Sequence, residues 1–169
     1  YSLNQDFDQK TVIIFLAKSN SELDFEKLGA IFYNFLKKNE INEIYLSKPK
    51  IKSFNSFSLL NSFLHGIKLK SYEFNLYKSK KNKNNINIQV VKSKNQINKN
   101  SKFKLDAVLE GVNFTKDLVS EPGNILNPET YAEKCLKLKI PNLKIKILNQ
   151  QQLEKIGMRA LLGVSQGSV

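Results

Sequence analysis

The sequence predicts an α/β fold, a layered mixed sheet with helices on both faces. The chain has 169 residues, of which 41% are hydrophobic, and this is enough to bury a sizeable core. Segments with strand-like apolar patterns alternate along it with segments whose apolar residues recur at helical spacing. The first such segment, Thr11–Ala17, is a continuous apolar run with several β-branched residues, as expected of a central strand covered on both faces.

Two helices and a strand are predicted to follow this run. Asp24 is placed to cap a helix with one apolar stripe, and a short strand around Ile44 and Leu46 ends before Pro49. A second helix is expected over Ser56–Lys70. The predicted stripes consist of Phe25, Leu28, Phe32, Phe35 and Leu36 in the first helix and of Phe57, Leu60, Leu64 and Ile67 in the second.

The middle of the chain predicts one more strand and a long helix. Ile86, Ile88 and Val90 alternate with polar residues, which indicates a strand between two solvated loops. A helix is expected from Phe103 to Ser120. It should stop at Glu121, because Pro122 disfavours helical backbone at that residue. The apolar face of this helix consists of Leu105, Val108, Leu109, Val112, Leu118 and Val119.

The last third of the chain begins with the clearest helix start in the sequence. Asn127 is expected as the N-cap, followed by Pro128 and Glu129. Leu143–Ile147 alternates with lysines and predicts a strand, and a short helix over Gln151–Ile156 should end at Gly157. We expect Ala160–Val169 to form a close-packed strand and turn that is cut within an element, and Tyr1 to mark a trimmed start.

The net charge of +12 is concentrated in one segment. Lys78–Lys104 holds nine lysines and no acidic residue, with Tyr77 and Phe103 at its ends. Clustered lysines can bind phosphates, but readers of nucleic acids commonly use arginine, and Arg159 is the only arginine in the chain. A solvated loop in a lysine- and asparagine-rich sequence is therefore favoured over a nucleic-acid surface.

Few residues are candidates for chemistry. His65 is the only histidine and is interpreted as a structural or surface residue, and Cys135 lies on the inward face of its helix with Tyr131 and Leu138, as a small buried hydrophobe. Asp117 and Glu121 have the spacing of a carboxylate pair on one helix face, but solvated charges are favoured. Gly163 and Gly167 lack the pattern of a phosphate-binding loop. We expect no catalytic, metal-binding or cofactor-binding residue in this chain.

Composition also restricts the compartment. A single cysteine excludes a disulfide within the chain and fits a reducing environment. The sequence shows no secretory signal pattern, and its longest apolar run, Val12–Ala17, is far shorter than the roughly 20 residues of a membrane span. The expected location is the cytoplasm, without contact to a membrane.

Two segments resemble the leucyl aminopeptidase family, also called cytosol aminopeptidases or peptidase family M17. They are NFTKDLVSEPGNILNPE, Asn113–Glu129, and LEKIGMRALLGVSQGS, Leu153–Ser168, joined by a helix and the KIKILN stretch. A looser similarity covers GIKLKSYEFNLYKSK, Gly66–Lys80. Gly123 and Arg159 depart from the family pattern, and Arg159 puts positive-φ backbone at its position in doubt.

The resemblance implies a domain organisation. Residues 1–102 would be a non-catalytic N-terminal α/β domain of the macro-domain type, 103–127 a linker helix and elbow, and 128–169 the truncated beginning of the catalytic domain. It also implies a cytoplasmic metalloaminopeptidase that hydrolyses N-terminal residues from peptides with two divalent metal ions, manganese or zinc, and that assembles as a hexamer. The family's metal-binding segments do not occur in this sequence, so the chain alone is expected to be inactive.

The sequence leaves two alternatives open. One is a stand-alone nucleic-acid-binding module that uses the Lys78–Lys104 arm, which a steep loss of binding with added salt would reveal. The other is an α/β domain that binds a small ligand, ranked third because no glycine-rich loop follows the Thr11–Ala17 run.

Overall fold

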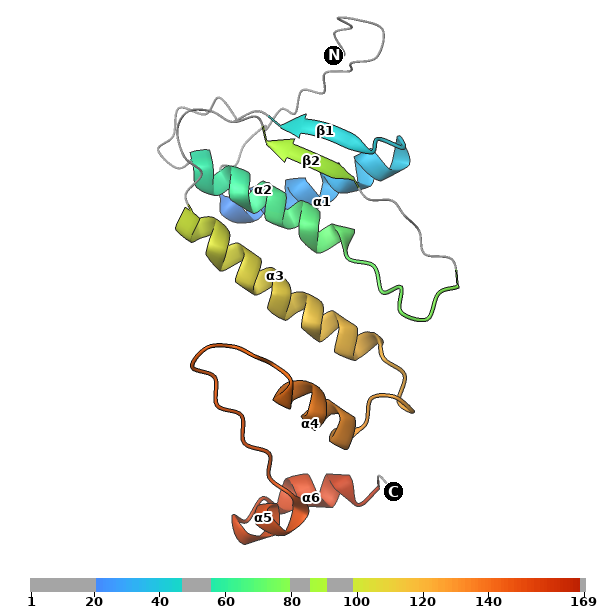
Figure 1. Ribbon diagram of the computed structural model, residues 1–169, viewed down its shortest axis with the longest axis vertical. Helices are drawn as coiled ribbons and strands as arrows, with labels where there is room; N and C mark the ends of the chain where they lie inside the picture. Colours follow the sequence, from blue (N-terminus) through green and yellow to red (C-terminus); the bar gives the residue numbers. More distant parts are fainter. Residues whose placement is uncertain (1–20, 47–55, 80–85, 91–98, 168–169) are drawn as a thin grey trace, which may run out of the picture. The chain divides into compact units, whose positions relative to one another are not determined.

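The structure is a computed structural model that describes residues 21–46, 56–79, 86–90 and 99–167 (Figure 1). The predicted strand at Thr11–Ala17 lies outside these residues. The chain divides into two compact units, Tyr1–Asp117 and Leu118–Val169. The described elements are α1 (Glu22–Lys38), β1 (Glu43–Leu46), α2 (Ser56–Ser71), β2 (Asn87–Val90), α3 (Lys99–Ser120), α4 (Pro128–Leu136), α5 (Gln150–Lys155) and α6 (Arg159–Ser165).

Helix α1 begins one turn earlier than the sequence suggested. Ser21 is the N-cap, and its hydroxyl oxygen accepts a hydrogen bond from the Asp24 backbone N–H at 3.2 Å. The prediction that Asp24 is the cap is therefore wrong: Asp24 lies in the first turn, where its charge favours the positive end of the helix dipole. The buried face consists of Phe25, Gly29, Phe32, Tyr33 and Leu36, while Phe35 is 41% exposed.

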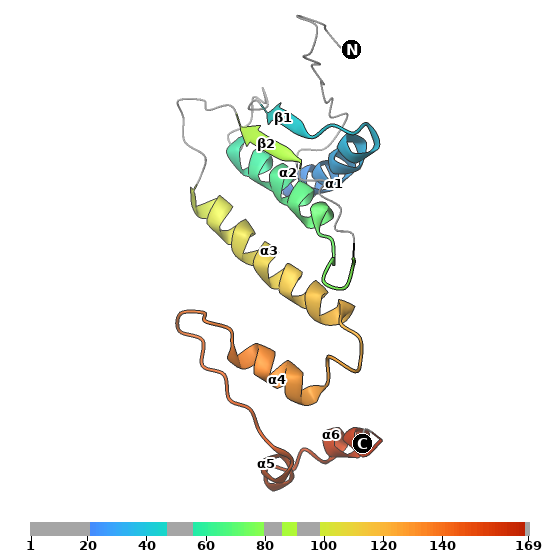
Figure 2. The same cartoon turned by 45° about the vertical axis from the view of Figure 1, so that its right-hand side comes forward.

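Strands β1 and β2 form a parallel pair with Ile44 opposite Ile88 (Figure 2). Ile44, Leu46 and Ile88 pack against the core side chains of α1 and α2. The other face is polar, because Glu43 accepts hydrogen bonds from Tyr45, Asn87 and Gln89. Among the described residues, helices thus cover one face of a two-stranded parallel sheet, not both faces of the predicted mixed sheet.

Helix α2 is buried along most of its length, on several sides. Leu59, Phe63 and Ile67 join the core of α1, and the Phe32 and Phe63 rings lie 5.5 Å apart. The helices α1 and α2 approach each other through two glycines. A Cβ on Gly29 would lie within 3.0 Å of the Phe63 carbonyl oxygen, and one on Gly66 would meet the Glu26 carbonyl just as closely. Glycine is required at both positions because backbone fills the space that a side chain needs.

Polar contacts join α3 to α2 and to the segment after it. Lys68 donates to Asp106 at 2.6 Å, and Tyr72 donates its hydroxyl to Asp117 at 2.7 Å. Lys116 donates to the Leu69 carbonyl at 3.0 Å, and its ammonium group lies 5.0 Å from the centre of the Tyr72 ring. Helix α3 begins four residues before the predicted start and ends at Ser120, as Pro122 indicated.

In the unit 118–169, the predicted helix start is confirmed. The Asn127 side chain accepts from the Thr130 N–H, and the Thr130 hydroxyl accepts from the Asn127 N–H, each at 2.9 Å. Helix α5 is also confirmed, and Gly157 follows it with a φ of 78°, a left-handed conformation that favours glycine.

Two strand predictions in this unit are wrong. Leu143–Ile147 forms no strand, because no other part of the described chain pairs with it and a strand needs a hydrogen-bonded neighbour. Residues 159–165 form helix α6 in place of the expected strand and turn. Alternating apolar residues and small residues are compatible with a strand and with other structures. Whether a strand forms depends on whether another strand pairs with the segment.

Apolar side chains are poorly covered in α4, α5 and α6, none of which has a buried residue. Leu136 is 57% and Val164 is 81% exposed. No helix of the described residues has both the length and the apolar character to cross a membrane.

Candidate functional site

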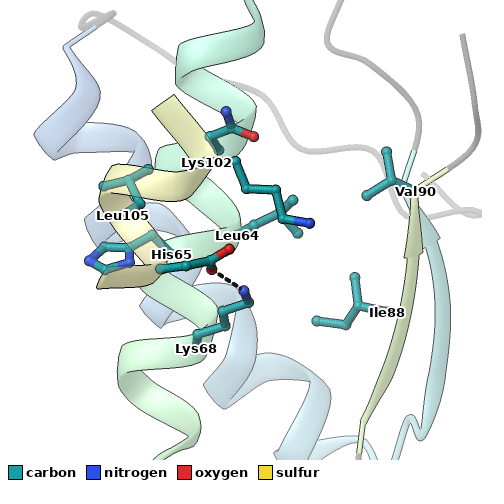
Figure 3. Close-up of a pocket in the computed structure, with 9 residues that line it drawn as sticks. Leu64, His65, Lys68, Ile88, Val90, Lys102 and Leu105 are labelled. Carbon is teal, nitrogen blue, oxygen red and sulfur yellow. Dashed lines mark hydrogen bonds and ion pairs between the residues drawn. The ribbon is translucent and has the colours of Figure 1, made fainter. Parts of the chain in front are cut away.

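The described part of the unit 1–117 holds a pocket of about 220 Å³ between α2, β2 and α3 (Figure 3). Four half-buried aliphatic side chains form its apolar walls, Leu64 from α2, Ile88 and Val90 from β2, and Leu105 from α3. Five polar side chains complete it, Asn61, His65 and Lys68 from α2 and Lys102 and Asp106 from α3. Below, "the pocket" means the site formed by these nine residues.

An ion pair crosses the pocket from α2 to α3. The hydrogen bond from Lys68 holds the pKa of Asp106 below its ordinary value of 3.8, and the positive charges of Lys68 and Lys102 act in the same direction. The Asp106 carboxylate is therefore ionised at neutral pH. The formal charges of Lys68, Lys102 and Asp106 sum to +1.

His65 lies in the inner wall of the pocket and is 4% exposed. Its Nε2 lies 3.8 Å from a carboxylate oxygen of Glu26 on α1, and its Nδ1 is buried with no hydrogen-bond partner. This position fits the interpretation of His65 as a structural residue of the helix layer.

Cys135 is only half-buried on α4, so its interpretation as a buried hydrophobe is wrong. The inward face predicted for this helix is largely open, because the Tyr131 side chain is 48% exposed. A hydrogen bond with the Cys135 sulfur raises the pKa of the Tyr131 hydroxyl above its ordinary value of 10.0.

The carboxylates of Asp117 and Glu121 each have their own partner. Asp117 is exposed and accepts the hydrogen bond from Tyr72. Glu121 is different, because its side chain is 6% exposed and accepts from Lys134 at 2.8 Å. The interpretation as solvated charges is therefore wrong for Glu121, whose ion pair ties the end of α3 to α4.

The two glycines near the C-terminal end do not lie together in one loop. Gly163 lies within α6 and Gly167 follows it, and both have room around them. Arg159 is the first residue of α6, and its φ is not among the positive ones, which resolves the doubt about its backbone.

The Lys78–Lys104 arm is described only in part. Strand β2 occupies its centre, and α3 begins within its last residues. Tyr77 is 56% and Phe103 is 77% exposed at its ends. Residues 80–85 and 91–98 of the arm, where the sequence predicts solvated loops, lie outside the described residues.

The pocket itself was missed by reasoning from the sequence. Its polar side chains come from two different helices, and the paired residues Lys68 and Asp106 are 38 positions apart. The local signals are the helical spacings of Asn61, His65 and Lys68 on α2 and of Lys102 and Asp106 on α3.

A group of three or more His, Cys, Asp or Glu side chains that could hold a metal ion does not occur among the described residues. The side chains available there therefore do not fit the two-metal site that the family resemblance implies.

Comparisons with known proteins agree in one family. A sequence model described as the cytosol aminopeptidase family, catalytic domain, matches residues 113–169. A probable cytosol aminopeptidase of Phytoplasma australiense is 34% identical over 146 residues, which is 85% of this chain and 29% of the relative. That of Phytoplasma mali (strain AT) is 42% identical over 119 residues, 67% of this chain and 24% of the relative.

A solved structure is also similar. A mutant of tomato leucine aminopeptidase aligns with a TM-score of 0.67 and 19% identity over 83% of this chain and 29% of that one. This likeness concerns the fold. The chain thus spans about a third or less of the length of these similar proteins.

Proposed function

Because the chain belongs to the cytosol aminopeptidase family, we propose that it is the N-terminal part of a metal-dependent leucyl aminopeptidase that removes N-terminal residues from peptides. The observation that carries the proposal is the 34% identity to a probable cytosol aminopeptidase over 85% of this chain. The proposed organisation is a non-catalytic N-terminal domain in residues 1–102, a linker in 103–127 and the beginning of the catalytic domain in 128–169. The catalytic-domain model matches from residue 113, so it also includes the second half of this linker.

In this proposal the chain contributes no catalytic or metal-binding residue. Family resemblance implies two divalent cations, manganese or zinc, in the complete enzyme. The side chains described here do not gather as such a site requires, so no chemical step is assigned to them. The proposed roles of this part are assembly into a hexamer and shaping of access to the active site in the cytoplasm.

The proposal is tested with the purified 169-residue chain and a chromogenic leucine amide, with added Mn²⁺ or Zn²⁺. We expect no release of leucine above that of a mock purification. Metal-dependent release that a chelator abolishes would contradict the assignment of catalysis to other residues.

The complementary experiment reads the coding frame past Val169 and assays the longer polypeptide. Lysine and carboxylate segments suited to two metal ions should follow, and the longer protein should cleave the same substrate. A stop codon soon after Val169 would overturn the proposal. Neither the comparisons nor the described residues favour the stand-alone nucleic-acid-binding alternative.

A further inference from the structure

We propose that the pocket binds a small aliphatic carboxylate. This inference rests on the residues of the pocket and does not depend on the proposed aminopeptidase activity. It assigns a ligand site to the described part of the unit 1–117.

The size of the pocket restricts the ligand. Pockets for drug-sized molecules have volumes of roughly 300–1,000 Å³. At about 220 Å³ this pocket is smaller, so a molecule with a short chain of carbon atoms fits it better than a nucleotide or a peptide.

The walls determine the chemistry of most of the ligand. Leu64, Ile88, Val90 and Leu105 come from three different elements and present aliphatic surface around one space. In Figure 3, Ile88 and Val90 on β2 point toward Leu64 and Lys102. An aliphatic chain placed there would exchange water for contacts with all three elements.

The charges determine the head group. Lys68 is already bonded to the carboxylate of Asp106, so within the described pocket Lys102 is the cation left for an incoming anion. Figure 3 shows the Lys102 side chain reaching toward the aliphatic walls from α3. A carboxylate would neutralise the one net positive charge, whereas an amine with the same chain would add to it.

The test is a titration of the 169-residue chain, followed by the amide chemical shifts of α2, β2 and α3. The probes are 4-methylpentanoate and L-leucine, which share an aliphatic chain and a carboxylate, with 4-methylpentylamine and acetate as controls. We expect saturable shifts at the pocket with 4-methylpentanoate and none with the two controls. If L-leucine binds more tightly than 4-methylpentanoate, the ligand belongs to the amino acids. If L-leucine binds more weakly, the ligand belongs to the carboxylic acids that lack an amino group.

Two variants make the result specific to the pocket. Lys102→Gln should weaken binding about tenfold, since a hydrogen bond to a charged group is lost. Lys104→Gln removes an exposed lysine of the same helix outside the pocket and should leave binding unchanged. Val90→Phe should fill the space and abolish binding. The proposal fails if 4-methylpentanoate gives no saturable shift, if the amine binds equally well, or if Lys102→Gln binds as the unsubstituted chain does.

Discussion

Lys37 and Glu73 join the end of α1 to the segment that follows α2. The Lys37 ammonium group donates to a Glu73 carboxylate oxygen at 2.8 Å, and Asn75 donates to the other oxygen at 3.3 Å. The hydrogen bond from Lys37, with that from Asn75, holds the pKa of Glu73 below its ordinary value of 4.5. The contact therefore stabilises the fold only while this carboxylate is ionised.

The change Glu73→Gln should lower the free energy of unfolding at pH 7 by less than about 1 kcal/mol, because the pair is partly exposed. The contribution of Glu73 is present above the unfolded pKa of about 4.5 and is lost as the pH falls through the lower folded pKa. Urea unfolding of both proteins between pH 7 and pH 3 checks this. If the difference in free energy of unfolding between the two proteins stays constant down to pH 3, this role of Glu73 is contradicted.

The residues of the candidate site show why the pocket could not be predicted from the sequence. His65 is the only histidine, but its neighbours Glu26 and Asp106 lie on other helices. Lys68 and Lys102 are two of many lysines, and nothing local distinguishes them. A pocket is a property of how elements pack, and periodicity within one element does not contain that information.

At the scale of elements, the crossing of α1 and α2 depends on Gly29 and Gly66. Each glycine faces a backbone carbonyl of the other helix, which cannot move without shifting the whole helix. The sequence pattern predicts this packing role for neither residue, because a glycine in a helical pattern has no apolar signature. The close approach of the two helices also explains why α2 is buried along most of its length.

Gly66→Ala should destabilise the unit 1–117 by about 1–3 kcal/mol or more, since the added methyl group has no space. Gly29→Ala should act in the same way. Gly111→Ala is the matched control, because nothing lies within 4 Å of its Cβ position in α3. It should stabilise the helix by about 0.5–1 kcal/mol. Thermal unfolding of the three variants separates the effects, and equal melting shifts would refute the account of the crossing.

The two reciprocal hydrogen bonds between Asn127 and Thr130, which form a capping box, lead to a second prediction at the scale of elements. Asn127→Ala removes the acceptor for the Thr130 N–H and should cost about 1 kcal/mol, a fall of about fivefold in the helix–coil equilibrium constant of α4. Backbone carbon-13 chemical shifts of residues 128–136 measure the helical population. Asn124→Ala, in the turn before the cap, serves as the control, and an equal loss of helix in both variants would exclude the capping explanation.

Helices were predicted well and strands less well, for a physical reason. Helices α1, α2, α4 and α5 have starts or ends within a few residues of the prediction, because caps, prolines and apolar stripes are local signals. Leu143–Ile147 has a clear alternation but forms no strand, since the partner that a strand requires is not encoded in the segment itself. Local patterns also failed to predict helix α6, since the small and apolar residues of that segment are compatible with both a strand and a helix.

On the scale of the molecule, the two units differ in how far they bury apolar surface. The unit 1–117 contains a core of aromatic and aliphatic side chains from α1 and α2. In the unit 118–169, helices α4, α5 and α6 have no buried residue. Apolar side chains exposed to this degree indicate a surface that another part of a protein covers.

We therefore expect amide hydrogens of α4–α6 to exchange faster than those of α1 and α2 in the 169-residue chain. Brief trypsin digestion should cut at lysines within 134–155 before it cuts in α1 or α2. In a polypeptide of the length of the relatives, the same amides should become protected. Equal protection of both units in the short chain would show that 118–169 needs no further cover.

The parallel pairing of β1 and β2 bears on the speed of folding. Its partners are far apart along the chain, as the hydrogen bond between Asn87 and Glu43, 44 positions away, illustrates. Closing such a long loop is entropically costly before any ladder bond forms, whereas a helix forms from contacts within each turn. The sheet should thus appear late, after α1 and α2 have met, and substitutions in β2 should change the unfolding rate more than the folding rate.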